Sequence, residues 1–333
     1  MTRRDVIIGG VLAAALFGMW YLHGRTDTPP EGPRLNVSSL RAEFESLIQS
    51  EGAEAAYRSF VETYSSQSLA AHSVMHVFGE TLYTTGGVDA VVACGPELEY
   101  GCYHGFFTQA VKREGISIVG QLDAACRNTT GEHITACQHG LGHGIIEFLG
   151  VDKLKEALEV CNQVPHDSPL GGCFSGVFMQ YNVPQTVAEN GTFQSTTRTP
   201  LDPGSPYDPC PTLPAAYQPA CYHSLGQWWE KLYAPHYERM GRLCALVPDY
   251  SYRTTCFHGL ATAMTSSAEF ESGEIIRRCR LMPDEESQTL CLRVAASSVE
   301  RRTHDTFRPA LICAALGTTS YECPGDVSAL SGS

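Results

Sequence analysis

The sequence contains none of the short motifs that identify common enzyme classes. It has no HExxH metalloprotease motif, no glycine-rich phosphate loop and no GxSxG nucleophile motif. Basic residues are scarce as well, with 23 Lys and Arg against 36 Asp and Glu, so the net charge is −13. Because nucleic acids bind mainly through cationic side chains, we expect no nucleic-acid partner for this chain.

Cysteine, in contrast, is abundant and regularly placed. The 14 cysteines form seven consecutive couples: Cys94/Cys102, Cys126/Cys137, Cys161/Cys173, Cys210/Cys221, Cys244/Cys256, Cys279/Cys291 and Cys313/Cys323. The second member of the couple recurs at intervals of 35, 36, 48, 35, 35 and 32 residues. A period in this range is typical of a solenoid of two-helix units, so we predict an all-α fold, an αα-repeat solenoid.

The residues after the second cysteine repeat too, and CxHG opens most of the units. The sequences are Cys102-Tyr-His-Gly, Cys137-Gln-His-Gly, Cys173-Phe-Ser-Gly, Cys221-Tyr-His-Ser, Cys256-Phe-His-Gly and Cys291-Leu-Arg-Val. Ala70-Ala71-His72-Ser73 takes the same register without a cysteine and is interpreted as an atypical first unit. The array then has about eight units of about 35 residues over 68–325, before a short tail at 326–333.

The N-terminal region predicts a membrane segment. An apolar run of 17 residues, Val6 to Leu22, follows Arg3 and Arg4 and precedes a Pro/Gly-rich linker at 27–37. The run is at the short end for a spanning helix, and the two arginines favour a cytoplasmic N-terminus. We therefore expect residues 1–26 to be an uncleaved signal-anchor with the remainder on the extracytoplasmic side. A cleaved signal peptide is the alternative, although no small-x-small cleavage site follows the run.

Export decides how the cysteines are interpreted. An even number of paired cysteines forms disulfides in an oxidising compartment, whereas the same residues in the cytosol suggest zinc. Sequence alone leaves the connectivity open, but separations of 8 to 12 residues make pairing within each couple the simplest geometry. Seven disulfides would leave no thiol for catalysis.

The predicted units have a longer first helix and a shorter second helix, so that one cysteine ends a helix and the next begins one. We expect first helices such as Cys137 to Leu149. The predicted second helices are Val119 to Cys126, Lys153 to Cys161 with Asp152 as N-cap, His236 to Cys244, Ser272 to Cys279 and Thr306 to Cys313. Two amphipathic helices, Ser39 to Gln49 and Ala53 to Tyr64, are expected to form an N-terminal hairpin at 38–67.

This layout resembles the Sel1-like, cysteine-rich αα-repeat proteins over residues 68 to 323, on the period and on couples such as Cys244/Cys256 and Cys279/Cys291. Those proteins are exported solenoids in which a disulfide joins the end of one unit to the start of the next. The resemblance implies an extracytoplasmic interaction surface. A protein partner on the concave face is the expected ligand.

One unit departs from the pattern. Residues 182–209 replace the expected second helix with a polar insertion rich in proline, glycine, serine and threonine. Such an insertion is either an ordered functional element on one face of the array or a surface loop without fixed structure.

The most specific chemical signal is a duplicated HxxxHxxxE motif. His72, His76 and Glu80 occupy one unit, and His139, His143 and Glu147 occupy equivalent positions of another. Histidines at i and i+4 on a helix can chelate one divalent metal, and a carboxylate can complete the coordination. With His104 as a further ligand, the two motifs could form a mononuclear or dinuclear site for zinc, iron, manganese or copper.

Structural interpretations compete with these signals. A histidine two residues after the cysteine, as in His104, His223 and His258, can simply donate a hydrogen bond to a loop carbonyl of the preceding unit. Trp228 and Trp229 form either a ligand platform or core packing. The sequence therefore leaves two functions: a membrane-anchored binding or scaffold module, and a metal-dependent enzyme or metal-binding protein that uses the duplicated motifs.

Overall fold

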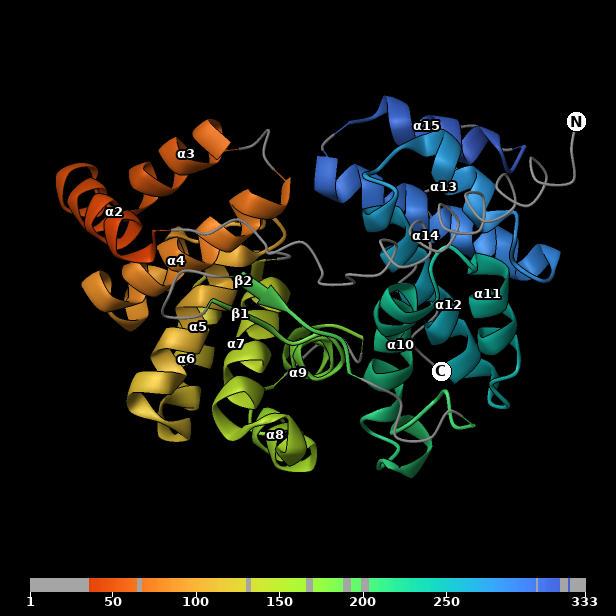
Figure 1. Ribbon diagram of the computed structural model, residues 1–333, viewed down its shortest axis with the longest axis horizontal. Helices are drawn as coiled ribbons and strands as arrows, with labels where there is room; N and C mark the ends of the chain where they lie inside the picture. Colours follow the sequence, from red (N-terminus) through yellow and green to blue (C-terminus); the bar gives the residue numbers. More distant parts are fainter. Residues whose placement is uncertain are drawn as a thin grey trace, which may run out of the picture. The chain divides into compact units, whose positions relative to one another are not determined.

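A computed structural model of the chain shows successive α-helices joined by short turns, with one two-stranded β-ribbon (Figure 1). The structure describes residues 36–64, 68–129, 133–165, 170–187, 193–198, 204–303, 305–317 and 323. The helices are α2 (Val37–Glu51), α3 (Ala53–Tyr64), α4 (Ser68–Gly86), α5 (Gly101–Glu114), α6 (Val119–Cys126), α7 (His133–Leu149), α8 (Leu154–Cys161), α9 (Gly172–Asn182), α10 (Gln218–Tyr233), α11 (Tyr237–Ala245), α12 (Tyr250–Ser267), α13 (Ser272–Cys279), α14 (Glu285–Thr303) and α15 (Phe307–Ala314). The short 3-10 helices are η1 (Val88–Ala93), η2 (Ile116–Ile118), η3 (Val151–Lys153) and η4 (Cys210–Thr212).

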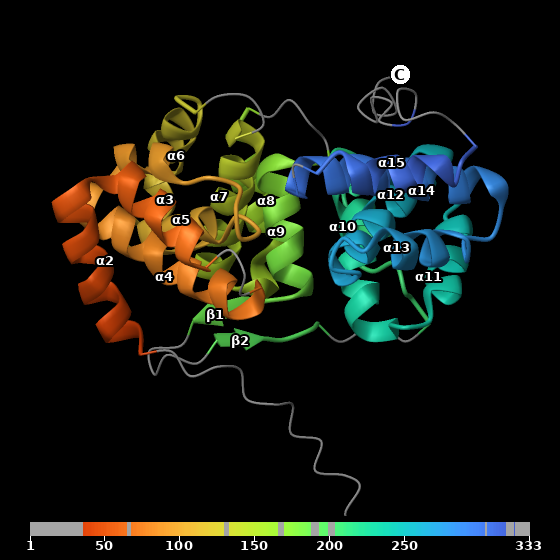
Figure 2. The ribbon, with the colours of Figure 1, turned by 90° about the horizontal axis from the view of Figure 1, so that it is seen from above.

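The longer helices follow one another as packed neighbours. Each contacts the next in the order α4, α5, α7, α9, α10, α12 and α14 (Figures 1 and 2). The shorter helices α6, α8, α11, α13 and α15 end at, or one residue beyond, the first cysteine of a couple. This all-helical, repeat-like organisation confirms the alternation of long and short helices that the cysteine period predicts.

All seven predicted disulfides are formed within their couples. The Cα atoms of each couple are 5.4 to 5.6 Å apart, within the usual range for a disulfide. No free cysteine is present among the described residues. The first six bonds each join a short helix, or the residue after it, to the first two turns of the next long helix. These bonds therefore fix the angle at which consecutive units meet.

Cys323 differs from the other second cysteines. It is bonded to Cys313 of α15 as predicted, with the two Cα atoms 5.4 Å apart, and it is fully buried. It lies in a bend, however, and does not begin a helix. The expectation that every second cysteine begins a helix was therefore wrong at Cys323. The physical reason is that no helix follows this couple among the described residues, so its disulfide joins α15 to a bend.

Local sequence explains several helix boundaries. The side chain of Asn36 accepts a hydrogen bond from the Ser39 amide at the start of α2, and Asp249 does the same for Tyr252 at the start of α12. Asp152, which we expected to cap α8, instead lies inside η3, and the N-cap residue is Lys153 without a side-chain hydrogen bond. That prediction was wrong because the chain after Gly150 makes a 3-10 turn before it becomes α-helical.

Aromatic side chains join the N-terminal hairpin to the array. Phe44 of α2 packs edge-to-face on Phe60 of α3 at a centroid distance of 5.4 Å, and on Phe78 of α4 at 5.3 Å. All three rings are buried. Further along the chain, Trp228 and Trp229 are fully buried in α10, so they are core residues and the ligand-platform interpretation was wrong.

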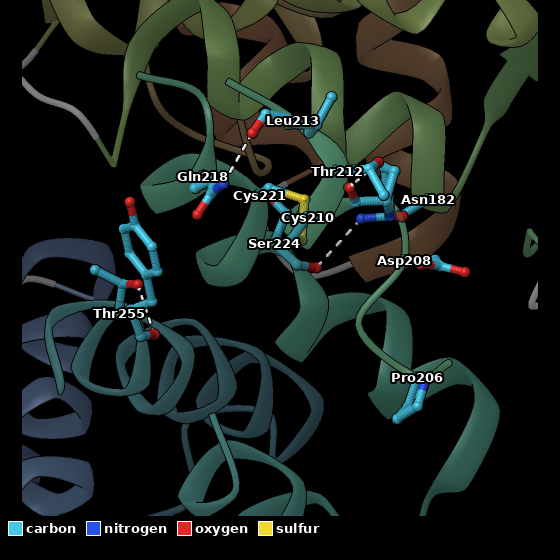
Figure 3. The surroundings of a disulfide bond; sticks show 12 residues. Asn182, Pro206, Asp208, Cys210, Thr212, Leu213, Gln218, Cys221, Ser224 and Thr255 are labelled. Carbon is cyan, nitrogen blue, oxygen red and sulfur yellow. Dashed lines mark hydrogen bonds between the residues drawn. A yellow bond between two sulfur atoms is a disulfide. The ribbon is translucent and has the colours of Figure 1, made fainter. Parts of the chain in front are cut away.

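The part of the 182–209 insertion that the structure describes is ordered. It contains the antiparallel strands β1 (Gln185–Val187) and β2 (Phe193–Ser195), which sequence reasoning did not foresee, and β1 contacts α4 (Figure 2). Arg198 then anchors the returning chain: its guanidinium lies 3.7 Å from the centre of the Trp228 ring, and it donates hydrogen bonds to the side-chain oxygen of Asn182 and the carbonyl of Asp208. Beyond it, the Cys210–Cys221 disulfide ties η4 to α10, where Asn182 reaches the Ser224 carbonyl (Figure 3).

The expected membrane segment at 1–26 and the expected tail at 326–333 lie outside the described residues. Among the residues that the structure does describe, no helix combines the length and apolarity that a membrane crossing requires.

Candidate metal centre

Three neighbouring long helices bring five histidines together. His72 and His76 lie on α4, His104 on α5, and His139 and His143 on α7, and α5 packs against both of the other helices. The centroid of the His104 ring is 5.3 Å from that of His76 and 4.1 Å from that of His143. The two HxxxH pairs that the sequence singles out therefore flank His104, one pair on each side.

Glycine allows the helices to come this close. A Cβ atom added at Gly105 would overlap the carbonyl oxygen of His76 in α4, and one added at Gly144 would lie 2.6 Å from the carbonyl oxygen of Phe107 in α5. No side chain fits at either position unless the helices separate. Gly105 is the glycine of the first CxHG motif. The motif therefore provides the His104 imidazole and, at the next position, a residue without a side chain, which allows α4 to pack closely against α5.

The histidines form two groups whose geometry suits a shared metal ion. The first is His72, His76 and His104, and the second is His104, His139 and His143. In each group one ring nitrogen of every member lies within 4.8 Å of the others. Among the residues that the structure describes, the groups with this property contain only histidines, and His104 belongs to both.

Hydrogen bonds orient the outer rings toward the centre of each group. Nδ1 of His72 is 2.8 Å from the carbonyl oxygen of Leu98, which can only accept, so Nδ1 donates this hydrogen bond. Nδ1 of His143 is likewise 3.1 Å from the side-chain oxygen of Gln180. Metal-binding histidines are usually held in this way, by a partner on the nitrogen that does not bind the ion.

Within each pair, the two Nε2 atoms face each other. They are 3.0 Å apart in His72 and His76, and 3.1 Å apart in His139 and His143. Two nitrogens that each lie about 2.1 Å from one ion are about 3.0 Å apart at a right angle and about 3.4 Å apart at the tetrahedral angle. The pairs are therefore close to the separation that a common metal ion would impose.

His104 has no hydrogen-bond partner among the described residues. Its side chain is 1% exposed, and neither Nδ1 nor Nε2 forms a hydrogen bond. Buried polar atoms are nearly always satisfied, and each one left without a partner costs about 1–3 kcal/mol. Two such atoms on one ring, between two pairs of imidazoles, indicate a ligand that the polypeptide itself does not supply.

Burial favours the neutral form of four of these imidazoles. It lowers the pKa of His76, His104 and His143 well below the usual value, and lowers the pKa of His139 to about 4. Neighbouring histidines reinforce the effect on the first three, because each would repel a second positive charge. The neutral ring is the form that binds a metal, so these histidines need not lose a proton at neutral pH.

The backbone that supports His72 is strained. Leu98, Glu99 and Tyr100 have φ values of 52°, 55° and 64°, a left-handed conformation that non-glycine residues seldom adopt. The run ends at the N-terminus of α5, where the Leu98 carbonyl meets His72. Such strain costs about 1–3 kcal/mol per residue and is concentrated at functional sites.

The two glutamates of the repeated motif do not join the histidine groups. Glu80 pairs with Arg41 at 2.6 Å. Glu147 accepts a hydrogen bond from Thr108 at 3.0 Å, and burial raises its pKa to about 7. A residue at i+8 lies about 12 Å along the helix from the first histidine, beyond the reach of a ligand in the same coordination shell.

The insertion covers one side of the first group. The side-chain oxygen of Gln185 in β1 is 3.3 Å from Nε2 of His72, and its backbone exchanges two hydrogen bonds with the Gln180 side chain, which also contacts His143. Sequence reasoning did not identify Gln180 or Gln185. Their only signal was their position at the start of the one unit that departs from the repeat.

The remaining CxH histidines, His223 and His258, belong to neither group. Nε2 of His223 in α10 is 3.0 Å from Nδ1 of His258 in α12. This pair lacks a third ligand among the described residues that could complete a metal site. His104 makes no hydrogen bond to a loop carbonyl of the preceding unit, so the structural interpretation does not hold for it.

No family model, curated protein or solved structure matches this chain. The resemblance to Sel1-like proteins therefore remains a prediction, and the site is interpreted from its own geometry. Three imidazoles would hold an ion while leaving a coordination position open, as in metal sites that bind water or a substrate.

We expect acid to destabilise the metal-free protein, in part through His223 and His258. Burial lowers their pKa values to about 4 and about 3. Both are neutral in the folded chain at pH values where they are protonated in the unfolded chain. Their contribution to the free energy of unfolding is therefore fully present above about pH 6.5 and is lost as the pH drops toward 4. Each histidine contributes a slope of up to about 1.4 kcal/mol per pH unit in that window.

Denaturant unfolding in the presence of a chelator, at several pH values between 7 and 4.5, measures this slope. A His223→Gln/His258→Gln variant should show a shallower decline than the parent chain. If the free energy of unfolding falls with pH equally steeply in the two proteins, His223 and His258 do not contribute to the loss of stability in acid.

Proposed function

We propose that this protein is an extracytoplasmic, disulfide-stabilised αα-solenoid that binds a transition metal through its histidine centre. The observation that supports this most directly is His104, which belongs to both histidine groups and whose two buried ring nitrogens make no hydrogen bond with any described residue. A scaffold without a ligand would have no reason to keep an unsatisfied imidazole there.

The nitrogen ligands limit which metal ions the site can bind. Imidazole nitrogen suits zinc, copper, iron and nickel, whereas magnesium, calcium and manganese prefer oxygen ligands. Neither histidine group includes a carboxylate, so of the metals that the sequence suggested, zinc, copper and iron(II) remain candidates and manganese is disfavoured. Copper binds most tightly to a given nitrogen site, so availability in the compartment would decide between it and zinc.

The location is part of the proposal. Seven disulfides are typical of an oxidising compartment, and residues 1–26 would hold the protein at the membrane. Membrane attachment would keep the metal site near the outer surface of the membrane, where an ion can be exchanged with a partner or the medium.

Elemental analysis of the full-length protein, purified in mild detergent without chelators or immobilised metal, tests the proposal. We expect at least one equivalent of zinc, copper or iron per chain after dialysis. If the protein contains no stoichiometric metal and takes up none of these ions when they are added, metal binding is refuted. A binding or scaffold module, with a protein partner on the concave face, would then be the function to test.

A further inference from the structure

The two histidine groups share a single residue, and they share no other. His104 belongs to both, whereas the pair on α4 and the pair on α7 never occur in one group of the described residues. A single ion bound by both pairs would need all four outer rings around one point. The two groups therefore mark two candidate binding points that have only His104 in common.

The repeat explains why there are two points. Equivalent positions of α4 and α7 present an HxxxH pair, and α5 lies between these helices and presents one histidine to both. At the position of α5 that corresponds to His76 and His143, the chain has Thr108, whose hydroxyl bonds to Glu147. The middle helix therefore offers one imidazole with two nitrogens where each flanking helix offers two imidazoles.

The nitrogens of His104 differ from those of the outer rings. His72 and His143 each use Nδ1 in a hydrogen bond and present only Nε2. Both nitrogens of His104 are buried and without a partner. An imidazole with both nitrogens available can bind two ions at once.

We propose that His104 bridges two metal ions, one held with His72 and His76 and the other with His139 and His143. This inference rests on the proposed metal-binding function and specifies its nuclearity. Neutral imidazole has a proton on one nitrogen, so binding the second ion releases that proton to solvent and leaves a bridging imidazolate. Each ion then has three nitrogen ligands and an open position for water or an exogenous anion.

Copper(II) is the probe, because a bridging imidazolate couples the unpaired electrons of two copper ions. The metal-free full-length protein is titrated with copper while bound copper is counted and the electron paramagnetic resonance signal is integrated. We expect uptake of two equivalents per chain. The integrated signal of the two-copper protein should fall below that of a sample with one copper and one zinc.

Variants locate the bridge. His72→Gln/His76→Gln and His139→Gln/His143→Gln should each keep one tightly bound copper with an uncoupled signal. His104→Ala should abolish the coupling, and any copper that it retains should give its full signal. Unchanged disulfide mapping and helix content in each variant show that the loss is not caused by unfolding.

The results of the copper titration test the His104 bridge and the proposed metal binding separately. One copper per chain that is lost when either pair is replaced would indicate a mononuclear site, which overturns the bridge but keeps metal binding. Two coppers with a full, uncoupled signal in the parent chain would also overturn the bridge. A parent chain that takes up neither copper nor zinc would overturn the bridge and the proposed function together.

Discussion

A chain with His76→Gln and His143→Gln is expected to lose its stoichiometric metal and the thermal stabilisation that zinc gives to the parent chain. Each substitution removes one of the two facing Nε2 atoms of a pair, so both groups are reduced to two imidazoles. A ligand at about 1,000 times its dissociation constant stabilises the folded state by about 4 kcal/mol. For a chain of this length, that stabilisation raises the melting temperature by roughly 5–10 °C. The variant should not show this increase when zinc is added.

The matched control is His223→Gln/His258→Gln. It also replaces two contacting histidines of neighbouring long helices, 3.0 Å apart, but outside both groups. This control should keep the metal and the zinc-dependent shift. Thermal unfolding with and without zinc, followed by circular dichroism, makes the comparison. Loss of the shift in the control alone, or its persistence in the test variant, would contradict the assignment of the site.

Gly105→Ala is expected to destabilise the folded protein more than Gly101→Ala in the same helix, where the nearest atom to an added Cβ is 2.9 Å away. The new Cβ would overlap the His76 carbonyl of α4, which is backbone and cannot move by changing a rotamer. Overpacking of this kind costs about 1–3 kcal/mol, and more where backbone must shift. Separation of α4 from α5 would also move His104 away from His72 and His76, so metal uptake should fall as well.

Gly120→Ala in α6 controls for the general effect of replacing a helical glycine. No atom lies within 4 Å of a Cβ added there, and alanine favours helix by up to about 1 kcal/mol. That variant should be as stable as the parent chain or slightly more so. Melting temperature and zinc uptake are measured for both variants. If Gly105→Ala matches Gly120→Ala, the close approach of α4 and α5 is not required for the site.

The repeat and the disulfides could be predicted because both depend on local spacing. A couple such as Cys126/Cys137, separated by 11 residues across one turn, leaves few alternatives once the period is recognised. The pairs His72/His76 and His139/His143 could be predicted for the same reason, since residues at i and i+4 share a helix face. Glu80 and Glu147 extended that pattern too far, because the rise of the helix takes i+8 away from the first histidine of the motif.

The sequence predicts His104 as a further ligand, but its position between the two pairs could not be predicted. Its CxHG motif is the same as that of His258, and only the packing of α5 between α4 and α7 distinguishes them. Gln180 and Gln185 were missed for a related reason. They act through the fold of the insertion back onto α4, a long-range contact that no local pattern encodes.

A crystal structure of the metal-loaded protein, with anomalous diffraction recorded at the zinc or copper absorption edge, tests the histidine centre most directly. The predicted result is two anomalous peaks on opposite sides of the His104 ring, each about 2.0–2.1 Å from one of its nitrogens and from one pair of outer histidines. Ordered water at both His104 nitrogens, with no anomalous peak among these five histidines, would contradict it.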